Sequence, residues 1–200
     1  MSAREAAEST IRDEHRTLGA VMEALQRMLA DVAAQHAEPD FALFSAALCY
    51  LSDFPERCHH PKEDEYLFDA LRRRTTDFNA VLDELQAEHI RGAQALDQLQ
   101  RALVHYQGGT PGGLGLFRTA VEAYSATLGE HMRKEEALLT QAHDRLAEED
   151  WSRIAAAFGA NDDPLTGGAH REEFRRLYLR ILNLLPRKIK MPAQHTRNER

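Results

Sequence analysis

The sequence is poor in cysteine and lacks any long apolar segment. Only two of its 200 residues are cysteines. Cys49 and Cys58 stand in one predicted helix, about 13 Å apart along its axis, which is too far for a disulfide bond, so we predict two reduced thiols. No segment approaches the roughly 20 apolar residues that span a bilayer, and residues 1–10 are charged, unlike a secretory signal. These absences predict a cytoplasmic protein with no membrane partner.

Basic residues are fewer than acidic residues. The chain has 25 Lys and Arg residues against 32 Asp and Glu residues, which gives a net charge of -7. A protein that binds duplex nucleic acid needs a basic surface to neutralise phosphates and release counterions. The charge balance therefore argues against a nucleic acid partner. A length of 200 residues with 43% hydrophobic content is enough to fill one globular core.

Glycine and proline are scarce outside three short segments, which we interpret as loops. Between these loops, apolar residues recur at helical spacing and no segment alternates as a strand does. Because short connections make neighbouring helices antiparallel, we predict an all-α fold, an up-down-up-down four-helix bundle with additional C-terminal helices. Asp40, and Thr75 or Thr76, are the predicted N-caps. The four long helices are expected from about Ala3 to Gln35, Phe41 to Arg73, Thr76 to Gln107 and Leu114 to Arg145.

The chain continues beyond this bundle. A short helix is expected from about Glu148 to Phe158 and an amphipathic helix from about His170 to Leu185, followed by a basic tail after Pro186. We divide the chain into the bundle (residues 1–146), a helical extension that packs on it (residues 147–186) and a mobile tail (residues 187–200). The amphipathic helix could instead form a dimer contact, so we expect a monomer or a homodimer.

Two prolines interrupt the second predicted helix. Pro55 and Pro61 each remove a backbone hydrogen bond, at a cost of roughly 3 kcal/mol in a helix interior. The segment could therefore be two helices that are divided at Pro55. We favour one kinked helix, because Pro61 lies between His59 and Glu63, where a site could use the distortion.

The two halves of the sequence repeat one pattern of histidine and glutamate. The segment EHRTLGAVMEALQRML aligns with EHIRGAQALDQLQRAL, and HHPKED, which begins at His59, aligns with HMRKEE, which begins at His131. Each half thus offers one lone histidine and one His-x-x-x-Glu pair. The alignment selects His59 rather than His60 as the partner of Glu63. His60 lies about 100 degrees round the helix, and the sequence leaves open whether it is a residue at the rim of a site.

The predicted helices place these histidines and glutamates at one level. Residues i and i+4 stand on one helix face about 6 Å apart, although a single His-x-x-x-Glu pair is common on charged helices. The starts of the first and third helices and the ends of the second and fourth lie at one end of the bundle. Counted from that end, each helix carries its histidine or His-x-x-x-Glu pair about 12 or 13 residues in, which is about 18 Å deep. We therefore predict one interior layer of metal ligands, made of His15, His59, Glu63, His89, His131 and Glu135.

The donor set predicts a pair of metal ions. Imidazole and carboxylate without thiolate suit iron or manganese, with copper and zinc also accepted by ligand type, and the precedent of helical bundles favours iron. Four imidazoles and two carboxylates exceed the needs of one tetrahedral ion. If both glutamates bridge, six side chains fill roughly eight of twelve positions on two octahedral ions, and an oxo or hydroxo bridge fills about two more. The remaining open positions could take O2, NO or peroxide.

Residues around this layer are expected to orient the imidazoles by accepting their remaining N–H groups. The candidates, most of which we expect to be solvated, are Asp13, Glu14, Asp64, Glu88 and Glu130. Tyr124 could point at the site, but a tyrosine that only packs in the core is the favoured interpretation. The other histidines have no partner at this level and are interpreted as surface or structural residues: His36, His105, His143, His170 and His195.

With these residues the chain resembles the hemerythrin-like, or HHE cation-binding, domain family. The resemblance covers about Thr10 to Arg145, and its specific parts are HHPKEDEYLF and EHMRKEEALL. It implies that the six ligands hold two iron ions, with both glutamates bridging. The oxygen-carrying hemerythrins place a second histidine one turn after the ligand of the third helix, where this chain has Ala93. This departure argues against stable O2 carriage and favours chemistry on O2, NO or peroxide, or iron donation.

The leading functional hypothesis is therefore a non-haem di-iron binding protein that binds or senses O2, NO or peroxide, or handles iron under oxidative or nitrosative stress. Its cofactors would be two iron ions, Fe2+ or Fe3+, with an oxo or hydroxo bridge. Two alternatives stay open. One is a di-iron enzyme that reduces NO or peroxide or repairs iron centres, and the other is a helical interaction module whose histidines and glutamates are incidental.

Overall fold

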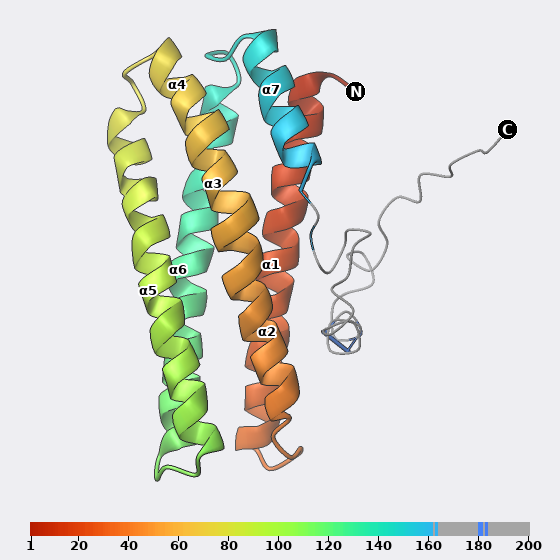
Figure 1. The fold of residues 1–200 in the computed structure, drawn as a ribbon, viewed down its shortest axis with the longest axis vertical. Helices are drawn as coiled ribbons and strands as arrows, with labels where there is room; N and C mark the ends of the chain where they lie inside the picture. Colours follow the sequence, from red (N-terminus) through yellow and green to blue (C-terminus); the bar gives the residue numbers. More distant parts are fainter. Residues whose placement is uncertain (162, 164–179, 182, 184–200) are drawn as a thin grey trace, which may run out of the picture.

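Four long helical rods lie side by side and run alternately up and down (Figure 1). The computed structural model describes residues 1–161, 163, 180, 181 and 183. Every regular element in these residues is helical, which confirms the predicted all-α up-down-up-down bundle with an additional helix after it. The rods are α1 (Ala3–Ala33), a composite second rod over residues 41–74, α5 (Asn79–Gln107) and α6 (Gly113–Ala142), and the shorter α7 (Glu148–Gly159) follows them.

The second rod is one continuous helical stretch in which α-helical and π-helical turns alternate. Pro55 opens the first π-helical segment, and Pro61 lies between the two. Because neither proline can donate a backbone hydrogen bond, the rod takes up the wider i→i+5 turns in this region. The alternative in which the helix ends at Pro55 is therefore wrong. The rod consists of α2 (Phe41–Phe54), η1 (Pro55–His59), α3 (His60–Lys62), η2 (Glu63–Phe68) and α4 (Asp69–Arg74).

The two predicted N-caps have different outcomes. Asp40 caps α2, and its side chain accepts a hydrogen bond of 3.0 Å from a backbone N–H of the first turn. The prediction that Thr75 or Thr76 caps the next helix is wrong, because a turn intervenes and α5 begins only at Asn79. The hydroxyl of Thr75 instead accepts a hydrogen bond of 3.1 Å from the backbone of Asp77 within that turn.

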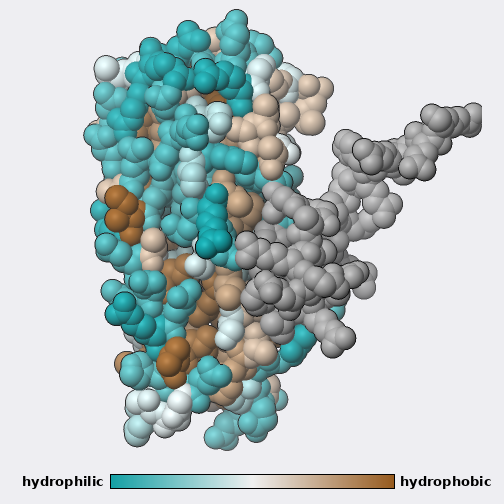
Figure 2. Space-filling model, in the orientation of Figure 1, coloured by the Kyte–Doolittle hydropathy of each residue, from teal (hydrophilic) through white to brown (hydrophobic). Residues whose placement is uncertain are grey.

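The buried apolar side chains form two separate clusters, one in each half of the bundle. The cluster nearer the α1–α2 and α5–α6 connections includes Phe44 and Phe117, and the cluster at the opposite end includes Phe68 and Trp151. Both cysteines are free, as predicted, and both are half-buried. The visible face of the bundle is mainly hydrophilic, with apolar side chains at the surface chiefly in its lower half (Figure 2). The gap between the two clusters is filled by polar residues.

The segment after the bundle begins with α7, which packs beside α1 (Figure 1) and buries Trp151, Ile154 and Phe158. The predicted helix from His170 to Leu185 lies outside the described residues except for positions 180, 181 and 183, and the predicted basic tail after Pro186 lies wholly outside them. The domain boundaries after residues 146 and 186 stay predictions. None of the helices in the described part of the chain combines the length and the apolar content that a membrane-spanning helix requires.

The close approach of α5 and α6 generates a stability prediction. A Cβ atom at Gly113 would lie 2.8 Å from the Cα of Tyr106, and backbone atoms cannot move aside as a side chain can. We expect Gly113→Ala to destabilise the fold by about 1–3 kcal/mol. Gly115 is the matched control, because a Cβ there meets nothing within 4 Å, and Gly115→Ala should stabilise the helix by about 0.5–1 kcal/mol. Chemical denaturation measures both, and equal stabilities would contradict the expected crowding.

Candidate metal centre

A layer of buried polar side chains crosses the bundle between the two apolar clusters. The four rods all contribute to it, and each of the six residues singled out from the sequence is at most 7% exposed. The structure therefore brings all six together in the interior. They are His15 from α1, His59 and Glu63 from the second rod, His89 from α5, and His131 and Glu135 from α6.

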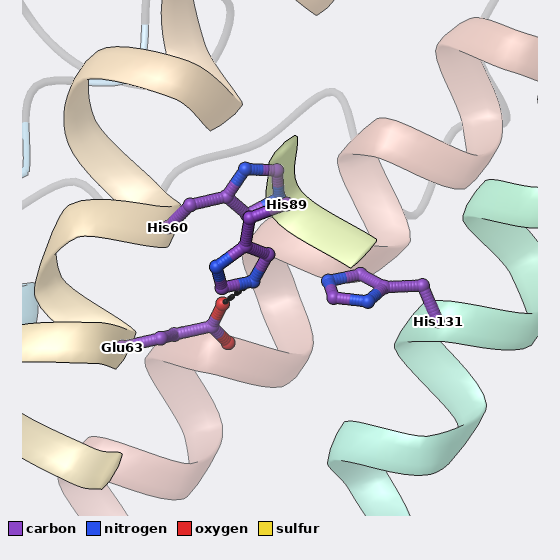
Figure 3. Close-up of side chains that lie close together, drawn as sticks. All are labelled: His60, Glu63, His89 and His131. Carbon is purple, nitrogen blue, oxygen red and sulfur yellow. Dashed lines mark ion pairs between the residues drawn. The ribbon is translucent and has the colours of Figure 1, made fainter. Parts of the chain in front are cut away.

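The layer consists of two groups of side chains, each of which could hold a metal ion. Within each group, one ligand atom from every member lies within 4.8 Å of those of the other members. Figure 3 shows the members of the second group pointing toward one another. Glu63 belongs to both groups. The first group is His15, His59, Glu63 and Glu135, and the second is His60, Glu63, His89 and His131.

Glu63 lies between the two groups and directs one carboxylate oxygen toward each. Its Oε1 is 3.3 Å from Nε2 of His59 in the first group. Its Oε2 is 3.5 Å from Nε2 of His89 in the second. The carboxylate is completely buried. This placement is what a carboxylate needs in order to bridge two adjacent ions.

Glu135 occupies the equivalent position on α6. Its Oε2 is 3.3 Å from Nε2 of His15, and its Oε1 is 2.9 Å from Nε2 of His131. The Nε2 atoms of His15 and His59 face each other at 3.0 Å. The two glutamates therefore stand between two sets of imidazoles, and both are placed to bridge.

Carboxylates outside the layer lie beside the second ring nitrogen of three imidazoles. If each Nδ1–H donates to its carboxylate, the lone pair of Nε2 is directed into the layer, in the form that binds a metal. Two other candidates, Asp13 and Glu130, instead pair at the surface with Arg16 and Arg133. The three contacts are His59 Nδ1 to Glu14 at 2.8 Å, His131 Nδ1 to Glu88 at 3.0 Å and His89 Nδ1 to Asp64 at 3.3 Å.

The segment after the bundle supports one side of this layer. Asn161, which follows α7, donates from Nδ2 to Oε1 of Glu14 at 2.8 Å. Phe158 of α7 packs edge-on against His59, with ring centroids 5.9 Å apart. The ring that Glu14 orients is therefore also held from outside the four rods. The helix α7 closes the layer on the side formed by α1 and the second rod.

The buried pairs shift the pKa values of imidazoles and carboxylates in opposite directions. Burial alone would lower the pKa of His15, but Glu135 and Glu63 raise it to about 9. Burial would likewise lower the pKa of His89, but the carboxylates around it, Asp64 first, raise it to about 12. Burial alone would raise the pKa of Glu63, but the surrounding imidazoles hold it well below its usual range. A metal ion must therefore displace protons from these imidazoles.

Several polar atoms of the layer have no hydrogen-bond partner among the described residues. They include both oxygens of Glu63, Oε2 of Glu135 and Nε2 of His131; some of these lie at ion-pair distance from a neighbour without the geometry of a hydrogen bond. An unsatisfied buried polar group costs about 1–3 kcal/mol, and more when it is charged, so an ion is one explanation for such atoms. These are the same atoms that face the interior of the two groups. The residues present therefore fit coordinated cations.

His60, whose role the sequence left open, is also a buried member of the layer. It is 7% exposed, and its ring stacks on that of His89 with centroids 4.1 Å apart and planes 12° apart. It follows His59 directly, and the two lie at the junction between η1 and α3. Regular helical spacing would turn consecutive residues about 100 degrees apart and does not indicate that both are buried in the site. The nearest signal in the sequence is the pair of prolines that marks the distorted stretch.

A pocket of about 270 Å³ reaches the second group from the side of α5 and α6. His60 and His131 form its inner wall, and Tyr124, which is 4% exposed, lines it as well as packing in the apolar core. Small residues such as Gly92 and Ala95 leave this space open. The exposed histidines His36, His105 and His143 belong to neither group, and His170 and His195 lie outside the described residues.

Comparison with known proteins agrees with this geometry. The family model described as hemerythrin HHE cation binding domain matches residues 6–143. The matched span includes every member of both groups and covers well over half of the 200 residues. A comparison with curated proteins finds no match.

The pKa shifts predict opposite pH dependences with and without metal. In the metal-free protein, the raised imidazole pKa values stabilise the fold fully below about pH 6.5, and this stability is lost as the pH rises toward the value of about 9 for His15. The metal-loaded protein should become more stable over the same interval, since fewer protons compete with the metal. Thermal unfolding between pH 6.5 and about 9, with chelator or with excess metal, measures the two slopes. Slopes of the same sign would contradict this account.

Proposed function

This chain belongs to the hemerythrin HHE cation-binding domain family, and we propose that it is a non-haem di-iron protein that binds or senses O2, NO or peroxide, or handles iron under oxidative or nitrosative stress. Membership of the family implies that it binds cations. The proposal of a di-iron centre rests on the pair of adjacent donor groups with both glutamates between them.

The number and placement of the donors support two ions. A structural zinc site closes with four ligands, whereas this layer offers more donors than that and divides them into two groups. Glu63 and Glu135 each direct one oxygen to either side. A single ion would leave about half of these buried donors without a partner. Each unsatisfied donor side chain would cost about 1–3 kcal/mol.

The chemistry of the donors supports iron. Imidazole nitrogen and carboxylate oxygen suit iron or manganese, and neither group in the described part of the chain contains a cysteine. Histidine and glutamate donors that project inward from facing helices of a bundle also hold pairs of iron or manganese ions in other bundle proteins. Two bound irons would supply a change of redox state and an open position for a small ligand.

The protein itself contributes fixed donors, exclusion of bulk water and a route for a small molecule. The outer carboxylates Glu14, Asp64 and Glu88 hold three imidazoles with one nitrogen directed inward. Apolar clusters on both sides of the layer exclude bulk water. The pocket behind His60 and His131 brings a molecule the size of O2, NO or peroxide to within one side chain of the centre.

Metal content tests the proposal directly. The protein purified aerobically should contain about two irons per chain, by the donor count above. His131→Ala should lose at least one of them, because it removes a buried donor. His105→Ala is the matched control, since this exposed histidine belongs to neither group, and it should keep both ions. Elemental analysis with near-ultraviolet absorption measures the outcome.

Two results would overturn the di-iron proposal: one zinc per chain, or no metal, in the unaltered protein. The same variants address the alternative of a helical interaction module with incidental histidines and glutamates. In that case added iron would not raise the unfolding temperature of the unaltered protein, and His131→Ala would unfold at the same temperature with and without iron. We expect iron to stabilise the unaltered protein and the control, and to stabilise His131→Ala much less.

A di-iron reductase acting on NO or peroxide is a second candidate, favoured by the pocket that reaches the centre. A route for small molecules permits repeated turnover as well as binding. Stopped-flow mixing of the reduced protein with an excess of NO or peroxide separates the two functions. We expect each di-iron centre to react once and then stop, which identifies a binding or sensing protein. Consumption of many equivalents with a matching supply of electrons would instead identify an enzyme.

A further inference from the structure

We infer that His60 is a metal ligand, which completes the group formed by Glu63, His89 and His131. The centre then has seven side-chain ligands instead of the six that the sequence pattern and the family resemblance indicate. This inference rests on the proposed metal centre and specifies which residues form it. It assigns a role to a buried histidine that the six-ligand description leaves without one.

The position of His60 places a ring nitrogen within reach of the same ion as the other three residues of the group. One of its ring nitrogens lies within 4.8 Å of the ligand atoms of Glu63, His89 and His131. Its ring centroid is 4.1 Å from that of His89 and 5.5 Å from that of His131. Figure 3 shows the three rings and the carboxylate of Glu63 directed at a common space. No other group of donors in the described residues contains three imidazoles.

The surroundings of His60 follow the pattern of the other ligands. Its Nδ1 lies 3.5 Å from Oε1 of Glu56, one helical turn earlier, as the Nδ1 of His59 lies beside Glu14. Neither of the two facing atoms, Nδ1 of His60 and Oε1 of Glu56, has a hydrogen bond among the described residues. If Nδ1 pairs with Glu56, Nε2 is the nitrogen left for the metal, as it is in the rings paired with the outer carboxylates.

The backbone explains how two consecutive residues serve two groups. His59 ends η1 and His60 begins α3, which is followed by η2 starting at Glu63. π-Helical segments often occur at functional sites. In this distorted stretch, His59 faces His15 of α1, whereas His60 stacks on His89 of α5. Glu63, one turn further along the rod, lies between the two donor groups.

A seventh ligand changes the count of open positions. The ion in the second group would receive three imidazoles and an oxygen from each glutamate, whereas the ion in the first would receive two imidazoles and the same carboxylates. By the count used above, about one open position would then remain on the pair of ions. The third imidazole of this group would come from α3, whereas position 93 of α5, one turn after His89, is an alanine.

Titration of the metal-free full-length chain with Fe2+ or Co2+ under anaerobic conditions tests the assignment. The unaltered protein should bind two ions. His60→Ala should bind one of them more than roughly 100-fold more weakly, which exceeds the 10- to 100-fold loss expected when an outer residue is removed. His60→Gln, which keeps most of the volume, should show the same loss. His105→Ala should bind both ions normally.

Added imidazole identifies the role as coordination. The pocket against His60 has a volume of about 270 Å³, which is enough to admit free imidazole into the space left by His60→Ala. Imidazole should then restore the second ion to that variant, and it should not change the unaltered protein. The visible absorption of bound Co2+ reports the restored nitrogen ligand. Far-ultraviolet circular dichroism of the metal-free variants confirms that the bundle still forms.

The outcomes separate this inference from the proposed function. If the unaltered protein binds two ions and both His60 variants bind them equally well, only the assignment of His60 is wrong. If His60→Ala loses an ion that imidazole does not restore, His60 is a positioning residue and not a ligand, and the assignment is again wrong. If the unaltered protein binds no ion, the proposed function and the assignment both fail.

Discussion

The whole structure depends on a layer of carboxylates and imidazoles that is buried at mid-height in the bundle. An isolated charge removed from water costs several kcal/mol, so such a layer persists only if every charge meets an opposite one or an ion. Glu63 and Glu135 meet imidazoles on both sides, and the rings meet further carboxylates behind them. A shift of any rod by one residue would turn its donors about 100 degrees away. The polar layer therefore fixes the register of the four helices.

The second rod shows where the chain accepts local strain. Two prolines and two π-helical segments occur within residues 55–68, which are also the residues that carry three of the donors. Each proline removes a hydrogen bond and costs roughly 3 kcal/mol in a regular helix. Buried neighbours such as Phe54, Leu67 and Phe68 hold this stretch in place from both apolar clusters. Distortion at the site is thus offset by packing next to it, as is common for functional sites.

The centre combines rigid donors with a local opening. All of its donors stand on helices, which hold side chains more accurately than loops do, and α7 adds Phe158 and the adjoining Asn161 on one side. On the opposite side, Gly92 and Ala95 leave a pocket beside His60 and His131. A small molecule can therefore approach along one face while the other faces stay packed.

Local spacing was enough to predict the four rods and α7, their order, the cap at Asp40 and the common level of the six donors, because helical periodicity and loop residues act over a few positions. The start of α5, the choice of Glu14, Asp64 and Glu88 among five outer carboxylates, and the burial of His60 could not be predicted in this way. These features depend on how closely helices distant in the sequence approach one another. They also depend on a change from α-helical to π-helical turns, which rotates side chains without altering the spacing of residues along the chain.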